Sequence, residues 1–547
     1  MSAAELILAS DRVITMAGRD EAGAVAIADG RIQGVLRRDE IEAARGPGTE
    51  VRDVGARPVL PGFVDVHAHS EVACRAAYGT VDCRAPECGT VDDVLEALRA
   101  GLEDHRGGWL VGQGNLFFDR KLAERRLPTR EELDRVSRTV PIALRAGGHV
   151  TVLSSAALAD AGIDAGYVAP THSITGRPAV ERDAAGEPTG VVKEMDNALP
   201  LPHQDRDTVR AAIEEGIHRL FTRNGVTTIG EISETTEGIE CMDELAAAGR
   251  LGARMRVYLW APGTLSLDEA CAWQDHIRLS AGDEHVRIQG VKLFADGGYS
   301  AASAAVKQPY VHTGGCHCGD IALETEDVVE ALRKTRAAGL QLAVHANGDR
   351  AQDWLSEIVA GQGGAPEGRM RTRIEHAGNF MPDPAAGELW RRAGILPVPQ
   401  PVFLYTFGDY FADYLGEYGT RGRFPFARLL SEGWPLSGSS DVWVGSEREA
   451  TNPMFGVWCC VARRSYDGNQ IDPEQAISVE AALRMHTLDA ALALGEEGER
   501  GSIEPGKAAD LVVLDRDPLA SSTDDLRSIR ASEVYLGGRE VLGARRP

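Results

Sequence analysis

Long apolar runs are absent from this chain of 547 residues. No stretch approaches the ~18 apolar residues that a membrane-spanning helix needs, and the N-terminus lacks the basic start and unbroken apolar run of a signal peptide. Positively charged residues are also in the minority, because the chain has 58 Lys and Arg but 82 Asp and Glu, which gives a formal net charge of −24. Such a surface repels phosphate backbones and anionic lipid headgroups, so we expect neither a nucleic-acid nor a membrane partner.

Cysteine is scarce, with nine residues scattered through the chain. An odd number without regular spacing favours free thiols in a reducing compartment over a disulfide framework. We therefore expect a cytoplasmic protein. Apolar residues at 43% and charged residues at 26% are typical of an ordinary globular chain.

The two ends of the chain have the same character. Residues 1–60 consist of short apolar segments and turns, including a hairpin with Asp29-Gly30 at its turn, and residues 500–547 repeat this pattern. We predict that both ends build one small β-sandwich domain. Two unrelated β-extensions are the alternative.

Between the ends, residues 61–499 alternate short apolar strands with helical patterns, which is typical of an α/β chain with a parallel sheet. Eight candidate strands are present, the number that closes a (β/α)8 TIM-like barrel. The gap after the first strand is too long for one crossover, so we predict an insertion at residues 78–205. The candidate strands end at Val64–Val66, Val226–Glu231, Met255–Trp260, Ile288–Phe294, Leu342–Val344, Arg373–Glu375, Ile395–Val398 and Pro435–Ser440.

An H-x-H pair closes the first candidate strand, in the block PGFVDVHAH that ends at His69. Residues i and i+2 of a strand point the same way, so His67 and His69 project together and can grip one metal ion. An isolated H-x-H is common in proteins without metal. The preceding apolar strand and Pro-Gly turn favour the metal site.

Three more polar residues follow candidate strands. His345 and His376 each come after a short apolar run, and Asp441 closes the last candidate strand. Ligands from different strands converge at the C-terminal face of a barrel, where a carboxylate can bind metal and accept a proton from water. Each histidine alone could be structural, and Asp441 could instead cap a helix.

A lysine, Lys292, lies inside an apolar strand, where an unpaired ammonium is costly. A buried lysine loses its proton readily, and the neutral amine can take up carbon dioxide as a carbamate that bridges two metal ions. A salt bridge to a barrel acid is the alternative. Asp296, four residues later, could be a further ligand or substrate contact, or the start of an Asp-Gly-Gly turn.

Taken in order, several blocks of the chain resemble the amidohydrolase superfamily, specifically its YtcJ-like branch, amidohydrolase family 3. Within that branch the length and layout are similar to N-substituted formamide deformylase. The blocks are PGFVDVHAH, PTREELDRVS, GGHVTVLSSAAL, GEPTGVVKE, VKLFADGG, HANGDRA, RIEHAG, SSD and GSIEPGKAADLVVLDRDP.

This resemblance implies a centre of two divalent metal ions, usually zinc. His67 and His69 would hold the more buried ion and His345 and His376 the other, and carbamylated Lys292 would bridge them. Asp441 would ligate metal and act as general base, while His149 and Glu194 of the insertion would lie near a small-molecule substrate. A homodimer is the expectation at the level of the family.

The implied reaction is attack of a metal-bound hydroxide on a C–N amide-type bond, such as that of an N-substituted formamide or a related small amide. One alternative is deamination of an aminated heterocycle on the same barrel. Another is a scaffold protein that kept the fold without the chemistry, although no position of the expected ligand set is missing.

Two segments depart from the family pattern. Gly230-Glu231 stands where relatives often carry His-Asp, so a contact behind the metal ligands is expected to differ. Cys316, His317 and Cys318, within Gly314–Gly319, could bind an additional metal or line a loop beside the substrate. Candidate pocket walls, with ordinary packing as the alternative for each, are Phe117, Phe118, Phe403, Tyr405, Trp443 and Trp458.

Overall fold

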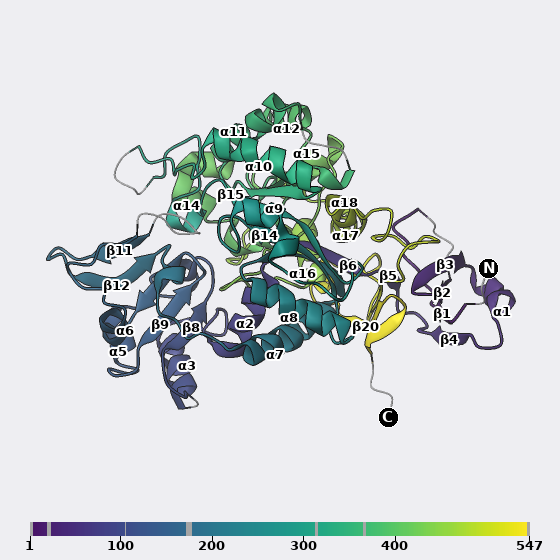
Figure 1. The fold of residues 1–547 in the computed structure, drawn as a ribbon, viewed down its shortest axis with the longest axis horizontal. Coiled ribbons are helices and arrows are strands. Elements are labelled where there is room, and N and C mark those ends of the chain that lie inside the picture. The colour runs from purple at the N-terminus through teal and green to yellow at the C-terminus, as the bar shows by residue number, and fades with distance from the viewer. Residues whose placement is uncertain are drawn as a thin grey trace.

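A computed structural model describes residues 4–18, 23–103, 105–170, 178–311, 316–364 and 368–543. Within these ranges the strands form four sheets, and helices pack around the largest of them (Figure 1). No helix in these ranges combines the length and the apolar character needed to span a membrane.

The largest sheet has seven strands in the order β18-β17-β16-β15-β14-β13-β6, and every neighbouring pair is parallel. Almost every residue of these strands is buried, as expected of a parallel sheet covered by helices. The predicted α/β, TIM-like barrel class is therefore confirmed. The strands are β6 (Phe63–Ala68), β13 (Val226–Ser233), β14 (Arg254–Trp260), β15 (Val286–Phe294), β16 (Gln341–His345), β17 (Arg373–Glu375) and β18 (Leu396–Val398).

The predicted eighth strand, Pro435–Ser440, was wrong as a strand, because this segment has no ladder of backbone hydrogen bonds. Its serine hydroxyls make the contacts instead: Ser439 Oγ donates to Pro399 O at 3.1 Å, beyond the end of β18. On the other side, the Asp441 amide donates to His67 O of β6 at 2.8 Å. The segment thus spans the gap between the two edge strands of the sheet.

The helices around the sheet begin and end at recognisable signals. In α10, Glu324 and Asp327 form a reciprocal capping box, and Gly339 ends the helix in the left-handed conformation, φ +70°. In α7, the Asp205 side chain accepts from the Thr208 amide. The main covering helices are α2 (Ser70–Gly79), α7 (Arg206–Gly216), α8 (Thr236–Ala247), α10 (Thr325–Ala338), α11 (Asp349–Gly361), α12 (Ala386–Ala393), α13 (Pro401–Phe407), α16 (Pro453–Ala462), α17 (Val479–Met485) and α18 (Leu488–Ala493).

The two chain ends share one hydrophobic core. Leu8 and Ile27 from the N-terminal strands belong to the same buried cluster as Leu511 and Tyr535 from the C-terminal strands. This favours one composite unit, while its boundaries at residues 60 and 500 stay predictions and residues 1–3 and 544–547 lie outside the described ranges. One sheet contains β1 (Leu6–Ala9), β2 (Ala24–Ala28), β3 (Arg31–Leu36) and β4 (Glu50–Asp53), and the other contains β5 (Val59–Pro61), β19 (Leu511–Leu514), β20 (Ala531–Leu536) and β21 (Arg539–Leu542).

The chain segment between α2 and α7 forms a separate sheet with its own helices. This sheet lies on the side of the barrel opposite β1–β4 (Figure 1). Val94, Leu95 and Leu98 form one face of its helix α3 (Val91–Glu103), and this face is buried in a hydrophobic core of the insertion's own. The limits 78–205 of this insertion stay a prediction. Its elements are β7 (Val81–Asp82), α3 (Val91–Glu103), β8 (Leu110–Gly114), α5 (Arg130–Asp134), β9 (Ile142–Ala146), β10 (Val150–Leu153), α6 (Ser155–Asp160), β11 (Ala179–Arg182) and β12 (Pro188–Lys193).

Candidate metal centre

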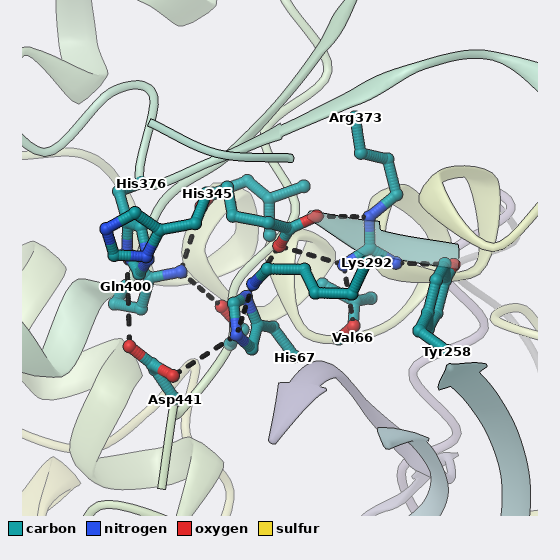
Figure 2. A network of polar contacts seen from close by, with 12 residues as sticks. Val66, His67, Tyr258, Lys292, His345, Arg373, His376, Gln400 and Asp441 are labelled. Atoms are coloured by element: carbon teal, nitrogen blue, oxygen red, sulfur yellow. Dashed lines mark hydrogen bonds and ion pairs between the residues drawn. The ribbon is translucent and has the colours of Figure 1, made fainter. Parts of the chain in front are cut away.

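Four histidines gather where the barrel strands end. His67 lies near the end of β6 and His69 just after it, while His345 ends β16 and His376 follows β17. All four are buried. Parallel strands end at the same edge of a sheet, which is why histidines distant in sequence meet here. Figure 2 shows the Asp441 carboxylate extending toward this group.

His67, His69 and Asp441 form the tightest group, with one ligand atom from each within 4.8 Å of the others. Asp441 Oδ1 lies 3.2 Å from His67 Nε2 and 3.6 Å from His69 Nε2. Asp441 has φ +45°, a left-handed conformation that is rare for a residue with a side chain. Such strain is typical of functional sites, where surrounding contacts hold it in place.

The other ring nitrogen of His67 faces Glu375, with His67 Nδ1 2.6 Å from Glu375 Oε2. Arg373 donates to both oxygens of Glu375, at 2.8 and 3.0 Å, so the carboxylate is fixed. If Nδ1 donates to the carboxylate, the lone pair of His67 lies on Nε2, toward Asp441. Glu375 was not among the predicted site residues, although it lies directly before His376.

His345 and His376 form a second pair, with His376 Nε2 2.9 Å from His345 Nδ1. His376 Nδ1 lies 2.7 Å from Gln400 Oε1. The Gln400 amide nitrogen donates to Ser439 Oγ and Val398 O, which leaves its oxygen as the acceptor for His376. This orientation assigns the hydrogen of His376 to Nδ1 and its lone pair to Nε2. Sequence reasoning missed Gln400, a lone glutamine in no ligand-like spacing.

Lys292 points from β15 into the same group, with its Nζ 3.4 Å from His67 Nε2 (Figure 2). The side chain is fully buried, and Nζ lies 4.6 Å from the centre of the Phe294 ring. Burial lowers the pKa of Lys292, although Glu375 and Asp441 act in the opposite direction. Burial also raises the pKa of Asp441, and Lys292 opposes that shift.

The histidines are held neutral. Burial lowers the pKa of His376 to about 3 and lowers the pKa values of His67, His69 and His345 well below the ordinary value. Neutral imidazole is the form that binds a metal ion. Within the described part of the chain, the buried His69 Nδ1 has no hydrogen-bond partner. Neutral imidazoles beside a carboxylate therefore fit a divalent ion such as zinc.

Asp296 is placed beside this group rather than in its centre. It accepts from the backbone amides of Asn347, Gly348 and Ala305, each at 2.8 Å, and its Oδ1 lies 3.4 Å from His345 Nε2. Burial raises its pKa to about 7. Asp296 thus ties together the loops after β15 and β16, and its role as a substrate contact stays a prediction.

The insertion reaches the centre through His149 and Glu194. His149 Nδ1 lies 3.0 Å from Glu194 Oε2, and the His149 ring packs edge-on against Trp443. Burial lowers the pKa of His149, but Glu194, Asp441 and Asp196 together outweigh burial and the net pKa is raised. His149 lines the same cavity as His67 and Asp441. Of the two predicted substrate-side residues, His149 is thus adjacent to the metal-ligand group, and Glu194 lies behind it in contact with the His149 ring.

Glu231 lies behind the metal ligands. It belongs to the Gly230-Glu231 segment, where the sequence departs from the pattern of the family. Its Oε2 accepts from the Ser70 amide at 2.7 Å, at the start of α2 directly after His69. A side chain at Gly230 would meet Val66 O at 2.1 Å, which explains why this position is glycine. A half-buried acid, Glu234, was also missed: its Oε1 lies 3.6 Å from His69 Nδ1, and desolvation raises its pKa to about 7.

Three of the six candidate pocket walls, Phe117, Phe403 and Trp443, line a cavity beside the centre. Phe118 packs in the core of the insertion, while Tyr405 and Trp458 pack with Phe455, away from that cavity. These three therefore follow the alternative of ordinary packing.

The loop with Cys316, His317 and Cys318 lies outside this centre. His317 Nε2 contacts Ala302 O at 2.8 Å, and Cys316 is exposed. Gly314 and Gly315 fall outside the described residues. Among the residues that are described, His67, His69 and Asp441 form the group of three donors whose ligand atoms all lie within 4.8 Å of one another, and the cysteines of this loop are not part of it.

Comparison with known proteins gives results that agree with this geometry. The family described as "Amidohydrolase family" matches residues 50–542. The N-substituted formamide deformylase of Arthrobacter pascens is 30% identical over 98% of this chain and 97% of its own length. The YtcJ protein of Bacillus subtilis (strain 168) is 25% identical over 95% of this chain and 96% of its own. Among solved structures, an uncharacterized metal-dependent hydrolase from Pyrococcus horikoshii OT3 superposes with a TM-score of 0.71 at 21% identity, covering 95% of this chain and 99% of that one.

Proposed function

The chain belongs to the amidohydrolase family of hydrolases, which act on carbon–nitrogen bonds, and we propose that it cleaves the amide bond of a small N-substituted formamide or a related amide. One observation carries the proposal: His67, His69 and Asp441 converge within 4.8 Å at the strand ends of the barrel. The match to the formamide deformylase over nearly the full length supports the substrate class.

His67 and His69 would hold one metal ion and His345 and His376 a second, with Asp441 completing the set. When bound, divalent metal polarises the amide carbonyl and lowers the pKa of water. Glu375 and Gln400 support this assignment, because each accepts from Nδ1 of one ring and so places the lone pair of that ring on Nε2, toward the other ligands. Trp443, packed against His69 and His149, supplies an apolar wall over the reacting group.

Lys292 would link the two metal positions as a carbamate. Its neutral amine attacks carbon dioxide, a C–N bond forms, and the displaced proton leaves, so the side chain becomes an anion with two ligand oxygens. Burial of the ammonium supports this step, because it lowers the pKa of Lys292 and so raises the neutral fraction.

Asp441 would move the proton in the reaction. Its carboxylate takes a proton from the attacking water and delivers it to the amide nitrogen, which must leave as a neutral amine. Burial supports this role, because it raises the pKa of Asp441 toward the pH at which a base can also return its proton.

Release of formate and amine from N-substituted formamides, by protein supplied with zinc, tests the proposal. We expect turnover by the native chain and a loss of at least about 100-fold in Asp441→Asn, the lower end of the effect of a general base. The variant should retain zinc and its thermal midpoint. Wild-type turnover in a zinc-loaded Asp441→Asn protein would refute the proton role, while ammonia release from aminated heterocycles without formate release would favour a deaminase.

A further inference from the structure

The chain between Asp441 and α16 forms a loop, residues 442–452, that has neither helix nor strand; we call it the Asp441 loop. The barrel holds the start of this loop, because the His69 amide donates to Val442 O at 2.9 Å. Asp441 itself has φ +45°, an unfavourable conformation that persists when surrounding contacts hold it. The contacts made farther along the loop therefore matter for the placement of Asp441.

The insertion holds the middle of the Asp441 loop through backbone groups. The Leu116 amide donates to Gly445 O at 2.8 Å, and Arg84 Nη1 donates to Ser446 O at 2.9 Å. Gly445 has φ +82°, and a side chain there would meet Gly114 O at 2.6 Å. The two segments therefore pack at a distance that only glycine allows.

A buried ion pair continues this contact. Lys121, the last residue of α4 (Phe118–Lys121), pairs with Glu447 of the Asp441 loop, and the two side chains are 0% and 6% exposed. Asn115 Nδ2 donates to the second oxygen of Glu447 at 3.0 Å. Asn115 Oδ1 accepts from the Ala85 amide at 2.6 Å, which fixes the orientation of the Asn115 side chain. Both oxygens of the Glu447 carboxylate thus bind side chains of the insertion.

The burial of this pair is better explained by position than by stability. Removing two charges from water costs about as much as their attraction returns, so an apolar pair of similar size often stabilises a fold equally well. A buried pair does fix geometry, because moving one partner away leaves an unpaired charge in the interior. Lys121 and Glu447 therefore set where the insertion and the Asp441 loop meet.

One hydroxyl connects this pair to Asp441. Ser446, directly before Glu447, accepts at Oγ from the Trp443 amide at 2.9 Å and donates to Asp441 O at 3.5 Å. The Asp441 carboxylate in turn lies 3.2 Å from His67 Nε2. A displacement of Glu447 is therefore passed through Ser446 to the residue that faces the metal ligands.

We propose that the insertion positions Asp441, with Lys121 and Asn115 as the positioning residues that hold Glu447. Among the described residues, none of these three lines the cavity that contains the metal-ligand group, so they act through the Asp441 loop rather than on the substrate. The proposal rests on the proposed function, in which Asp441 ligates metal and moves the proton. It makes a segment outside the barrel part of what builds the metal centre.

The double variant Lys121→Met/Glu447→Gln tests the proposal, because it removes both charges at similar size and leaves no unpaired buried ion. Its thermal midpoint should stay close to that of the native chain. We expect kcat for an N-substituted formamide to fall about 10- to 100-fold with little change in KM, because a misplaced base impairs the chemical step. Zinc affinity, measured by competition with a chelating dye, should fall about tenfold, because Asp441 is a ligand in this account.

Leu133→Ala is the matched control, because it truncates a fully buried side chain in the hydrophobic core of the insertion. It should lower the thermal midpoint and leave kcat and zinc affinity unchanged. Ser446→Ala removes only the connecting hydroxyl and leaves no buried charge unpaired, so it repeats the test even if the double variant does not fold. In Ser446→Ala both kcat and zinc affinity should fall about threefold or more.

Zinc affinity separates the failure of this proposal from the failure of the proposed function. Lower zinc affinity in the double variant and in Ser446→Ala, with no amide hydrolysed by the native chain, would support the positioning role and refute the proposed function. Native kcat and zinc affinity in Ser446→Ala or in the folded double variant would overturn the positioning role. Equal losses in Leu133→Ala would overturn it as well.

Discussion

The two nitrogens of His67 have different partners, and this difference sets what the residue can do. Nδ1 faces Glu375 at 2.6 Å, and Nε2 faces Asp441 at 3.2 Å. Glu375 is in turn fixed by Arg373, which also donates to the Tyr258 hydroxyl at 2.7 Å. A buried chain of this kind orients a metal ligand from behind.

The substitution Glu375→Gln tests that chain. It keeps an acceptor for His67 Nδ1 but removes the negative charge that makes the ring a stronger ligand. We expect zinc affinity, measured by competition with a chelating dye, to fall about 10- to 100-fold. The exposed acid Glu357 on α11 gives the control, Glu357→Gln. Lower stability with unchanged zinc affinity in Glu375→Gln would show that the residue is only structural.

At the scale of elements, the barrel places side chains by the ends of its strands. Because side chains alternate along a strand, the sequence alone predicts that His67 and His69 point together, and the structure brings them within reach of one ion. The positions of His345 and His376 follow from the same rule. The alternation of strands and helices thus predicted the fold class, and the positions of histidines at strand ends predicted the candidate metal ligands.

The remaining features could not be predicted because they depend on contacts between distant segments. Pro435–Ser440 has the composition of a strand, but the hydroxyls of Ser437 and Ser439 donate to Pro397 O and Pro399 O in place of a ladder of backbone hydrogen bonds. These contacts depend on where the neighbouring strand ends in space, which the sequence alone does not show. Gln400 and Glu234 have no ligand-like spacing, and each gains a role only when folding places it beside a histidine. Tyr405 and Phe407 are two residues apart on one helix, yet of these two only Phe407 lines the cavity beside the centre.

At the scale of the whole molecule, the metal-ligand group lies at one end of the barrel strands and a buried cluster of ion pairs lies at the other. Arg254 opens β14, at the edge away from the histidines, and makes two hydrogen bonds of 2.7 and 2.9 Å to Asp510, next to β19. Arg500 donates to the same carboxylate at 2.9 Å. A buried carboxylate between two arginines thus ties the C-terminal strands to the barrel.

The substitution Asp510→Asn should lower the free energy of unfolding by about 1–3 kcal/mol, because it removes the carboxylate that two buried guanidinium groups share and leaves Arg254 with Glu284 and Arg500 with Glu496. Urea unfolding at pH 7 measures the loss, and the exposed Asp524→Asn is the control. Burial raises the pKa of Asp510, but Arg254, Arg500 and the Gly537 amide together outweigh burial and the net pKa is lowered. The contribution is therefore present above the ordinary aspartate pKa and is lost as pH falls through the folded-state value. A difference from wild type that stays constant to the lowest pH would contradict this.

The central claim is that strand-end histidines of this chain hold metal for hydrolysis, and zinc stoichiometry tests it most directly. Equilibrium dialysis against zinc, followed by elemental analysis, should give two ions per native chain. Replacing His67 and His69 together by alanine should remove at least one of the two while the protein stays folded by circular dichroism. Two ions in that double variant, or none in the folded native protein, would contradict the account.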